Sequence, residues 1–141
     1  MKLLNISLIF FIFSTQVFAD YENSIKNFKL SIEEIQQGLS FANSISETRG
    51  ATGTLDRSEM SKIVNHAKKA LEYSKLVKEE DLDKLDPSLF FKSLSKNYEN
   101  MFRKGLMVYI EAWNEGDIAK GLKANRLLND WGDYYNKLLK K

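Results

Sequence analysis

The chain has 141 residues, a formal net charge of +2 and no cysteine. This near balance of charge argues against a nucleic-acid-binding protein, because such proteins carry a strongly basic face. Without cysteine there is no disulfide and no lipoprotein attachment site, so packing alone must hold the fold together. A chain of this length can bury enough apolar surface to do so.

The first nineteen residues resemble a secretory signal peptide. Lys2 provides a minimal basic start, and residues 3–13 are almost wholly apolar. Val17 and Ala19 supply the small residues that a signal peptidase recognises, so we expect cleavage after Ala19. The apolar run is shorter than the ~20 residues of a transmembrane helix. The sequence therefore predicts a mature protein of residues 20–141, without a membrane anchor, in the periplasm or secreted.

Residues 21–42 show the clearest helical periodicity in the chain. Their apolar positions recur at alternating steps of four and three, which predicts one face of an amphipathic helix. These positions are Tyr21, Ile25, Phe28, Ile32, Ile35, Leu39 and Ala42. The following stretch SETRGATGTLD, residues 46–56, contains Gly50 and Gly53 and predicts a loop. It lacks the lysine and the preceding strand of a phosphate-binding loop, so we do not expect it to bind phosphate.

A second helix is predicted to begin at Asp56, because Glu59 follows at capping-box spacing. Its inner face is thin and uses small residues, so a neighbouring helix can approach closely. This face comprises Met60, Ile63, Val64, Ala67, Leu71, Ser74 and Val77. The charged segment 78–87 is predicted to be an irregular turn that Leu82 and Leu85 hold against the core.

Two further helices follow. Asp86 and Pro87 predict the start of the third helix, and Gly116 predicts its end. Asp117 can cap the fourth helix at once, so the last two helices should be antiparallel neighbours. The apolar face of the third helix is broad, which indicates contacts on two sides, and Glu99 and Arg103 form an i,i+4 pair on its polar face.

The predicted inner faces of these two helices are Phe91, Leu94, Tyr98, Met101, Gly105, Val108 and Ala112 in the third, and Ala124, Leu127, Trp131, Tyr134 and Leu138 in the fourth. No run of alternating β-branched residues occurs, so strands are not expected. The sequence therefore predicts an all-α fold, a single domain of residues 20–141 arranged as an antiparallel up-down-up-down four-helix bundle.

Residue types that carry chemistry are few. His66 is the only histidine, and no acidic residue stands three or four positions from it. The Glu-x-x-His motif of di-iron bundles is missing, as are a zinc motif and a nucleophile elbow. We therefore expect His66 to be a partly exposed surface residue, and we expect neither a metal site nor catalytic residues. The protein is not expected to be an enzyme.

The stretch NDWGDYYNK, residues 129–137, concentrates aromatic side chains in an otherwise polar helix. Trp131, Tyr134 and Leu138 share one helical face at steps of three and four, which is the pattern of bundle packing. Trp131 and the tyrosines should lie against the early and middle parts of the third helix. The pattern favours core packing of this segment over a ligand pocket.

Two segments resemble the periplasmic cytochrome b562 family. They are ADYENSIKNFKLSIEEI at the mature start and NEGDIAKGLKANRLLNDWGDYYNK near the end. The resemblance implies a four-helix bundle that holds a non-covalent b-type haem. Where that family has its iron-binding methionine and histidine, this chain has Ile25 and Tyr135.

Two functions remain open at this point. The first is a non-catalytic binding or interaction role, as a monomer or homodimer, with an unknown protein or a small apolar ligand as partner and no cofactor. The alternative is electron transfer by a haem b whose ligands have moved. Tyr135, His66 and Met101 are the candidate ligands for that haem.

Overall fold

A computed structural model describes residues 4–49, 54–85 and 94–140, with side chains from Ala19 onward, Ser46 excepted. No strand occurs in these ranges, so the chain is all-α as predicted. The elements are α1 (Leu4–Arg49), α2 (Arg57–Lys75), α3 (Glu79–Leu85), α4 (Leu94–Asn97), the π-helical segment η1 (Tyr98–Arg103), α5 (Lys104–Glu115) and α6 (Ile118–Leu139).

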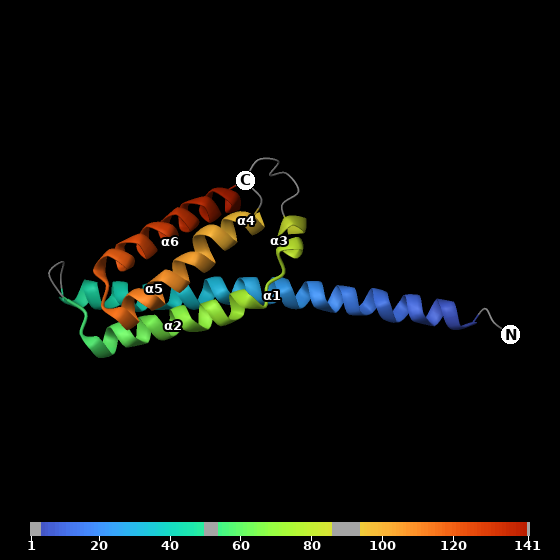
Figure 1. The fold of residues 1–141 in the computed structure, drawn as a ribbon, viewed down its shortest axis with the longest axis horizontal. Coiled ribbons are helices and arrows are strands. Elements are labelled where there is room, and N and C mark those ends of the chain that lie inside the picture. Colours follow the sequence, from blue (N-terminus) through green and yellow to red (C-terminus); the bar gives the residue numbers. More distant parts are fainter. Residues whose placement is uncertain (1–3, 50–53, 86–93, 141) are drawn as a thin grey trace.

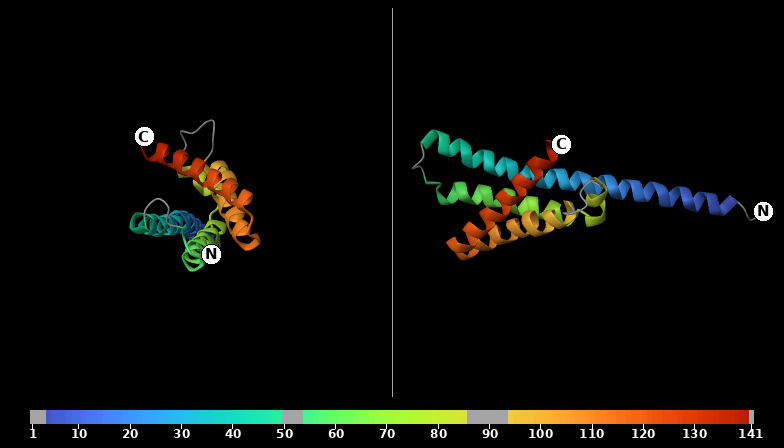
Figure 2. Two further views of the ribbon diagram at one scale, coloured as in Figure 1. Left: turned by 90° about the vertical axis from the view of Figure 1, so that its left-hand side faces the viewer. Right: turned by 90° about the horizontal axis from the view of Figure 1, so that it is seen from above.

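The long helices form two antiparallel hairpins (Figure 1). One hairpin consists of α1 and α2, and the other consists of α6 packed on the continuous rod α4–η1–α5. The hairpins meet where α2 packs on α5, and seen from above α6 crosses over α1 at an angle (Figure 2). The prediction is therefore confirmed at the level of an all-α chain, while the arrangement is less regular than four aligned helices.

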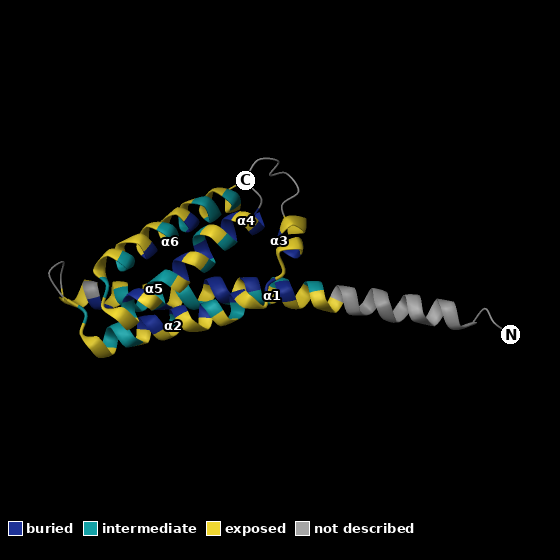
Figure 3. Ribbon diagram, viewed as in Figure 1, coloured by how far each residue is buried: buried dark blue, intermediate teal, exposed yellow. Residues whose placement is uncertain are grey.

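Close packing of α1 on α2 follows from the small residues on their facing sides. Ala67 and Ala70 of α2 are fully buried. On α1, a Cβ atom placed on Gly38 would lie only 3.1 Å from the Cβ atom of His66. The predicted close approach of a helix to α2 is thus confirmed, and Figure 3 shows the buried faces of both helices turned inward.

Local sequence signals place three of the helix ends correctly. Asp56 accepts a hydrogen bond from the Glu59 amide at 2.8 Å, and the Glu59 carboxylate accepts one from the Asp56 amide at 2.9 Å. Gly116 adopts a left-handed conformation with φ of 68°, and Asp117 accepts from the Lys120 amide at 3.0 Å. The predicted capping box and the tight turn between α5 and α6 are both confirmed.

The predicted turn at 78–87 is wrong, because residues 79–85 form the helix α3. Acidic side chains occupy its first turn and Lys84 its last, which suits the helix dipole at both ends. Leu82 anchors α3 in the core and is fully buried as expected, whereas Leu85 is exposed. The predicted helix start at Asp86 and Pro87 lies outside the described residues, as do Gly50, Gly53 and Phe91.

The first helix is longer than its apolar face predicts. It continues through Ser44 and Thr48, whose hydroxyls donate to the carbonyls of Phe41 and Ser44 within the helix, and it ends at Arg49. At its other end it runs unbroken past the expected cleavage point after Ala19. Within the described parts of the chain, no helix combines the length and the apolar character needed to cross a bilayer.

Candidate cleft between α1 and α6

An aromatic cluster fills the centre of the fold. Tyr98 and Phe102, from the π-helical segment, stack at 5.0 Å between ring centroids and are both buried. Trp131 of α6 contacts both rings at 5.5 Å, and Phe28 of α1 closes the cluster against Tyr98 at 5.2 Å. A π-helical turn shifts side chains off the regular helical positions. Here the π segment carries two aromatic rings that face the crossing of α1 and α6.

The π segment also fastens the two hairpins together. The Arg103 guanidinium donates to the carbonyls of Ser74 and Val77 at the end of α2, the latter at 2.8 Å. Its Nη1 atom donates to the Glu99 carboxylate at 2.5 Å, so the predicted i,i+4 pair is present. The placement of Arg103 on a polar face is wrong, however, because only 16% of its side chain is exposed. Arg103 therefore caps α2 from another helix.

A cleft of about 280 Å³ opens between α1 and α6 beside the aromatic cluster. Its apolar walls are Ile32, Ile35, Leu39, Phe102, Tyr109, Leu128, Trp131 and Tyr135. Four amide side chains, Gln36, Asn125, Asn129 and Asn136, complete the lining together with Gly132. Apolar walls with a few polar groups that fix orientation are typical of small-molecule sites.

Gly132 keeps the cleft open. A Cβ atom placed on this glycine would have no atom of the described residues within 4 Å, whereas one on Gly105 would meet Leu128 at 2.9 Å. Gly132 costs helix stability, since glycine is about 1 kcal/mol less favourable than alanine in a helix interior. No tight packing compensates for that cost here. The glycine instead leaves room beside Trp131.

The cleft is electrically neutral. None of the described lining residues is Lys, Arg, Asp, Glu or His. Burial raises the pKa of Tyr109 and that of Tyr135, so both phenols stay protonated at neutral pH and can donate or accept hydrogen bonds. The site can therefore hold an uncharged apolar group with a hydrogen-bonding edge, and no acid–base pair lines it.

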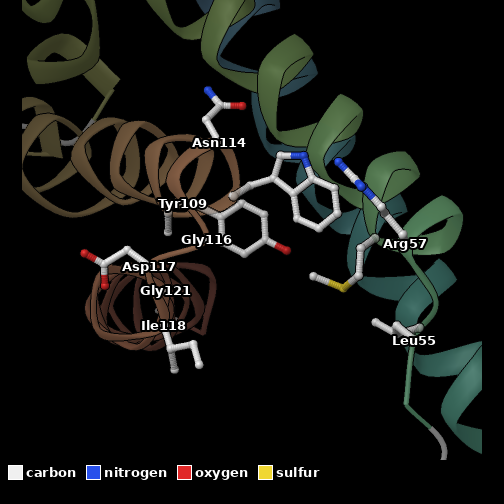
Figure 4. Close-up of a pocket in the computed structure, with 11 residues that line it drawn as sticks. Leu55, Arg57, Tyr109, Asn114, Gly116, Asp117, Ile118 and Gly121 are labelled. Atoms are coloured by element: carbon white, nitrogen blue, oxygen red, sulfur yellow. The ribbon is translucent and has the colours of Figure 1, made fainter.

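A second cavity of about 710 Å³ lies where the start of α2 faces the turn between α5 and α6 (Figure 4). Its lining comprises Leu55, Arg57, Met60, Tyr109, Ala112, Trp113, Asn114, Gly116, Asp117, Ile118 and Gly121. Figure 4 shows Leu55 and Arg57 on the α2 side, with Tyr109, Asp117 and Ile118 opposite. Tyr109 lines both cavities.

One face of α6 runs through both cavities. Ile118 and Gly121 line the second cavity, and Asn125, Leu128, Gly132 and Tyr135 line the cleft. Their spacing alternates between three and four residues, so they form one continuous helical face. Hereafter the two cavities together are called the α6 groove. With a helical rise of 1.5 Å per residue, the groove follows α6 for about 25 Å.

The three residues predicted as candidate haem ligands do not converge. Tyr135 lines the cleft, whereas His66 and Met101 line neither cavity. His66 lies between α1 and α2 with its Nδ1 atom 2.8 Å from the Glu34 carboxylate, and Met101 packs on the core cluster. The cleft thus offers one of the three candidates and no pair of opposed axial ligands.

The prediction that the aromatic segment 129–137 packs in the core is correct. It treated core packing and a ligand pocket as alternatives, however. Trp131 is buried and stacks on Tyr135 at 5.4 Å, so the core prediction is confirmed. The same segment also walls the cleft through Gly132 and Asn136. The cleft was not predicted because the glycines and asparagines on this face of α6 resemble those of an ordinary polar helix surface.

His66 also has a partner that local spacing did not indicate. Glu34 lies on the neighbouring helix, 32 positions away in the sequence, so helical spacing around His66 does not reveal it. The imidazole is partly exposed, as predicted, with 27% of its side chain accessible. Among the described residues no group of three or more histidine, aspartate or glutamate side chains is placed to hold a metal ion.

Comparison of the chain with protein-family models, with curated proteins and with solved structures finds no match in any of the three. The resemblance to cytochrome b562 therefore stays a prediction, and the case for function depends on the cleft.

Proposed function

We propose that residues 20–141 form an exported, non-catalytic binding protein that holds a small apolar ligand in the cleft between α1 and α6. In this proposal α1, α2, the rod α4–η1–α5 and α6 act as one four-helix bundle, opened on the side where α1 and α6 cross. The observation that carries it is the uncompensated space beside Gly132, bounded by Trp131 and by a rim of amides.

The neutral lining favours an uncharged ligand moiety. Burying a charge without a partner costs far more than burying an apolar group, and the cleft supplies no partner charge. Trp131 and Tyr135 contribute apolar wall to the cleft, while the amides offer donors and acceptors at the edge. The absence of an acid–base pair from this lining is why we propose binding without catalysis.

Export is the second part of the proposal. Residues at the expected mature end of α1 contact α3 and the segment between α2 and α3. There, Asp20 pairs with Lys78 at 3.1 Å, the Lys84 ammonium lies over the Tyr21 ring, and the Ser24 hydroxyl accepts from the Lys78 amide. A mature protein that starts at Asp20 therefore retains these contacts.

The test is binding of the neutral dye N-phenyl-1-naphthylamine, which brightens in apolar surroundings. We expect saturable binding by the mature protein and its loss in Gly132→Leu, where the new side chain fills the cleft. That variant should be as stable as the parent or more so, because leucine is the better helix former by about 0.5–1 kcal/mol. Asp133→Leu, at the adjacent exposed position, is the matched control and should bind normally.

Two results would overturn the proposal. One is dye binding that survives in Gly132→Leu, which would place the dye elsewhere. The other is a sharp Soret band in protein purified from its exported location and lost in Tyr135→Phe, which would identify a haem protein instead.

A further inference from the structure

The α6 groove combines an apolar, neutral half with a half that carries one unpaired cation. We propose that its ligand is a single long-chain carboxylate, a fatty acid in chemical class, whose chain lies in the cleft and whose head group reaches Arg57. This inference rests on the proposed function, since it assigns the identity of the ligand at the same site.

Arg57 is the only basic residue that lines either cavity in the described structure. It is exposed and has no ion pair among the described residues. The acidic side chains beside it are engaged: Asp56 caps α2, and Glu59 pairs with Arg49 at 2.6 Å. A guanidinium in this situation is free to bind a carboxylate through two parallel hydrogen bonds.

Arg57 does not stabilise α2 through its position. It is the first residue of α2, and a cation at a helix N-terminus opposes the helix dipole. Asp117, the acidic residue of the same cavity, instead stabilises α6 by accepting from the Lys120 amide. In Figure 4 its carboxylate points away from Arg57. The cavity thus presents a positive charge beside Met60, Tyr109 and Trp113.

The continuous face of α6 makes one ligand able to use both cavities. Ile118 and Gly121 at the Arg57 end and Asn125, Leu128 and Gly132 in the cleft follow one face of α6, with a glycine in each half. Tyr109 stands at the junction and lines both halves. A thin, flexible chain suits this path, and about 25 Å of groove accommodates an extended acyl chain with its head group.

The size of the cleft selects against a helical peptide as the occupant. Two turns of a helix about 10 Å across fill on the order of 800 Å³. The cleft between α1 and α6 measures about 280 Å³, which favours a thin chain over a helix as its occupant.

The experiment compares dodecanoate with 1-dodecanol, which has the same chain without the charge, by displacement of the neutral dye from mature protein. We expect dodecanoate to bind more tightly than the alcohol at one site per chain. Arg57→Gln should weaken dodecanoate binding by about three- to tenfold and leave the alcohol unchanged. Arg126→Gln, at an exposed position of α6 outside the groove, is the control and should change neither affinity.

Gly132→Leu should weaken dodecanoate binding as well, because one molecule would use both halves of the groove. Equal affinity for acid and alcohol, or an Arg57→Gln protein that binds both normally, would overturn the inference while the proposed function stands. Independent binding of two dodecanoate molecules would also overturn it.

Failure of dye, acid and alcohol alike would remove the proposed function itself. Displacement of bound dodecanoate by an amphipathic helical peptide of higher affinity would show a protein-binding groove instead.

Discussion

Arg103 shows how one side chain can determine the packing of two helices. Its guanidinium supplies donors to the carboxyl end of α2, where the last carbonyls of a helix lack partners within the helix. It also lies over the Tyr98 ring, 5.5 Å from the ring centroid. Because these contacts join residues 26 to 29 positions apart, local spacing could indicate the Glu99 pair but not the cap.

Arg103→Met should therefore lower the free energy of unfolding by about 1.5–3 kcal/mol, since it leaves the Val77 carbonyl without its described donor and removes a charge-assisted bond. Urea denaturation of the variant measures this loss. Arg126→Met, at an exposed position, should stay within about 0.5 kcal/mol of the parent. Similar midpoints for the two variants would show that Arg103 does not cap α2.

Tyr98 is predicted to make stability depend on alkaline pH. Burial raises the pKa of Tyr98, while its hydroxyl shares a 2.7 Å hydrogen bond with Ser31. The folded protein thus keeps this proton at pH values where the unfolded chain, with an ordinary tyrosine pKa of about 10, releases it. Stability from this group is full below that pH and is lost as the pH rises above it.

Tyr98→Phe should reduce the fall in unfolding free energy between pH 9 and 11, and should cost about 1 kcal/mol at pH 7 through the lost hydrogen bond. Burial also raises the pKa of Tyr109 and that of Tyr135, so part of the pH dependence of the unfolding free energy will remain. Urea titrations across this range measure it, with Tyr73→Phe on the partly exposed side of α2 as control. If the unfolding free energy of Tyr98→Phe falls with pH as steeply as that of the parent, Tyr98 is not a buried group that causes the fall.

At the scale of elements, the glycines of α5 and α6 have opposite packing environments. A Cβ atom on Gly105 would lie 2.9 Å from Leu128 and 3.3 Å from Leu127, whereas one on Gly121 would meet Ala112 at an ordinary 3.9 Å. Gly105 is therefore a point of close approach between α5 and α6. The sequence placed Gly105 on the inner face of its helix but gave no sign of the contact with Leu128.

Gly121→Ala should stabilise the protein by about 0.5–1 kcal/mol, because alanine is the better helix former and its methyl group has room. Gly105→Ala should be less stable than Gly121→Ala by 1 kcal/mol or more, because Leu128 must move to admit the methyl group. Thermal or urea midpoints compare the pair. Equal stabilisation by both changes would mean that the two helices are farther apart than described.

Helix ends could be predicted where nearby residues in the sequence mark them. Asp56 with Glu59, and Gly116 with Asp117, mark helix ends within four residues of sequence, and both were placed correctly. The π segment and α3 were missed, because the π segment differs from an α-helix in its hydrogen-bond register and α3 is a short charged segment in which Asp81 and Leu82 are buried. The cleft was also missed. It forms where α1 and α6 cross, and no pattern within either helix reports a crossing angle.

At the scale of the whole molecule, the expected signal segment should be dispensable for the fold. Asp20, the first residue of the expected mature protein, pairs with Lys78, and the Lys84 ammonium of α3 lies over the Tyr21 ring. We therefore expect protein recovered from its exported location to have the intact mass of residues 20–141 and a cooperative urea transition. Recovery of the full-length chain from the membrane fraction alone would contradict export and cleavage after Ala19.

The α6 groove has a tryptophan in each half, and these provide the most direct test of its proposed occupant. Trp131 lines the cleft and Trp113 lines the second cavity.

Bromine quenches tryptophan emission on close contact, so a brominated fatty acid reports where each part of its chain lies. In Trp113→Phe protein, whose only tryptophan is Trp131, dodecanoate with bromine at the chain end should quench emission saturably, with one molecule per chain. Bromine beside the carboxylate should quench it far less. Absence of saturable quenching by the terminal bromine, or stronger quenching by bromine beside the carboxylate, would contradict a ligand whose chain lies in the cleft and whose head group lies at Arg57.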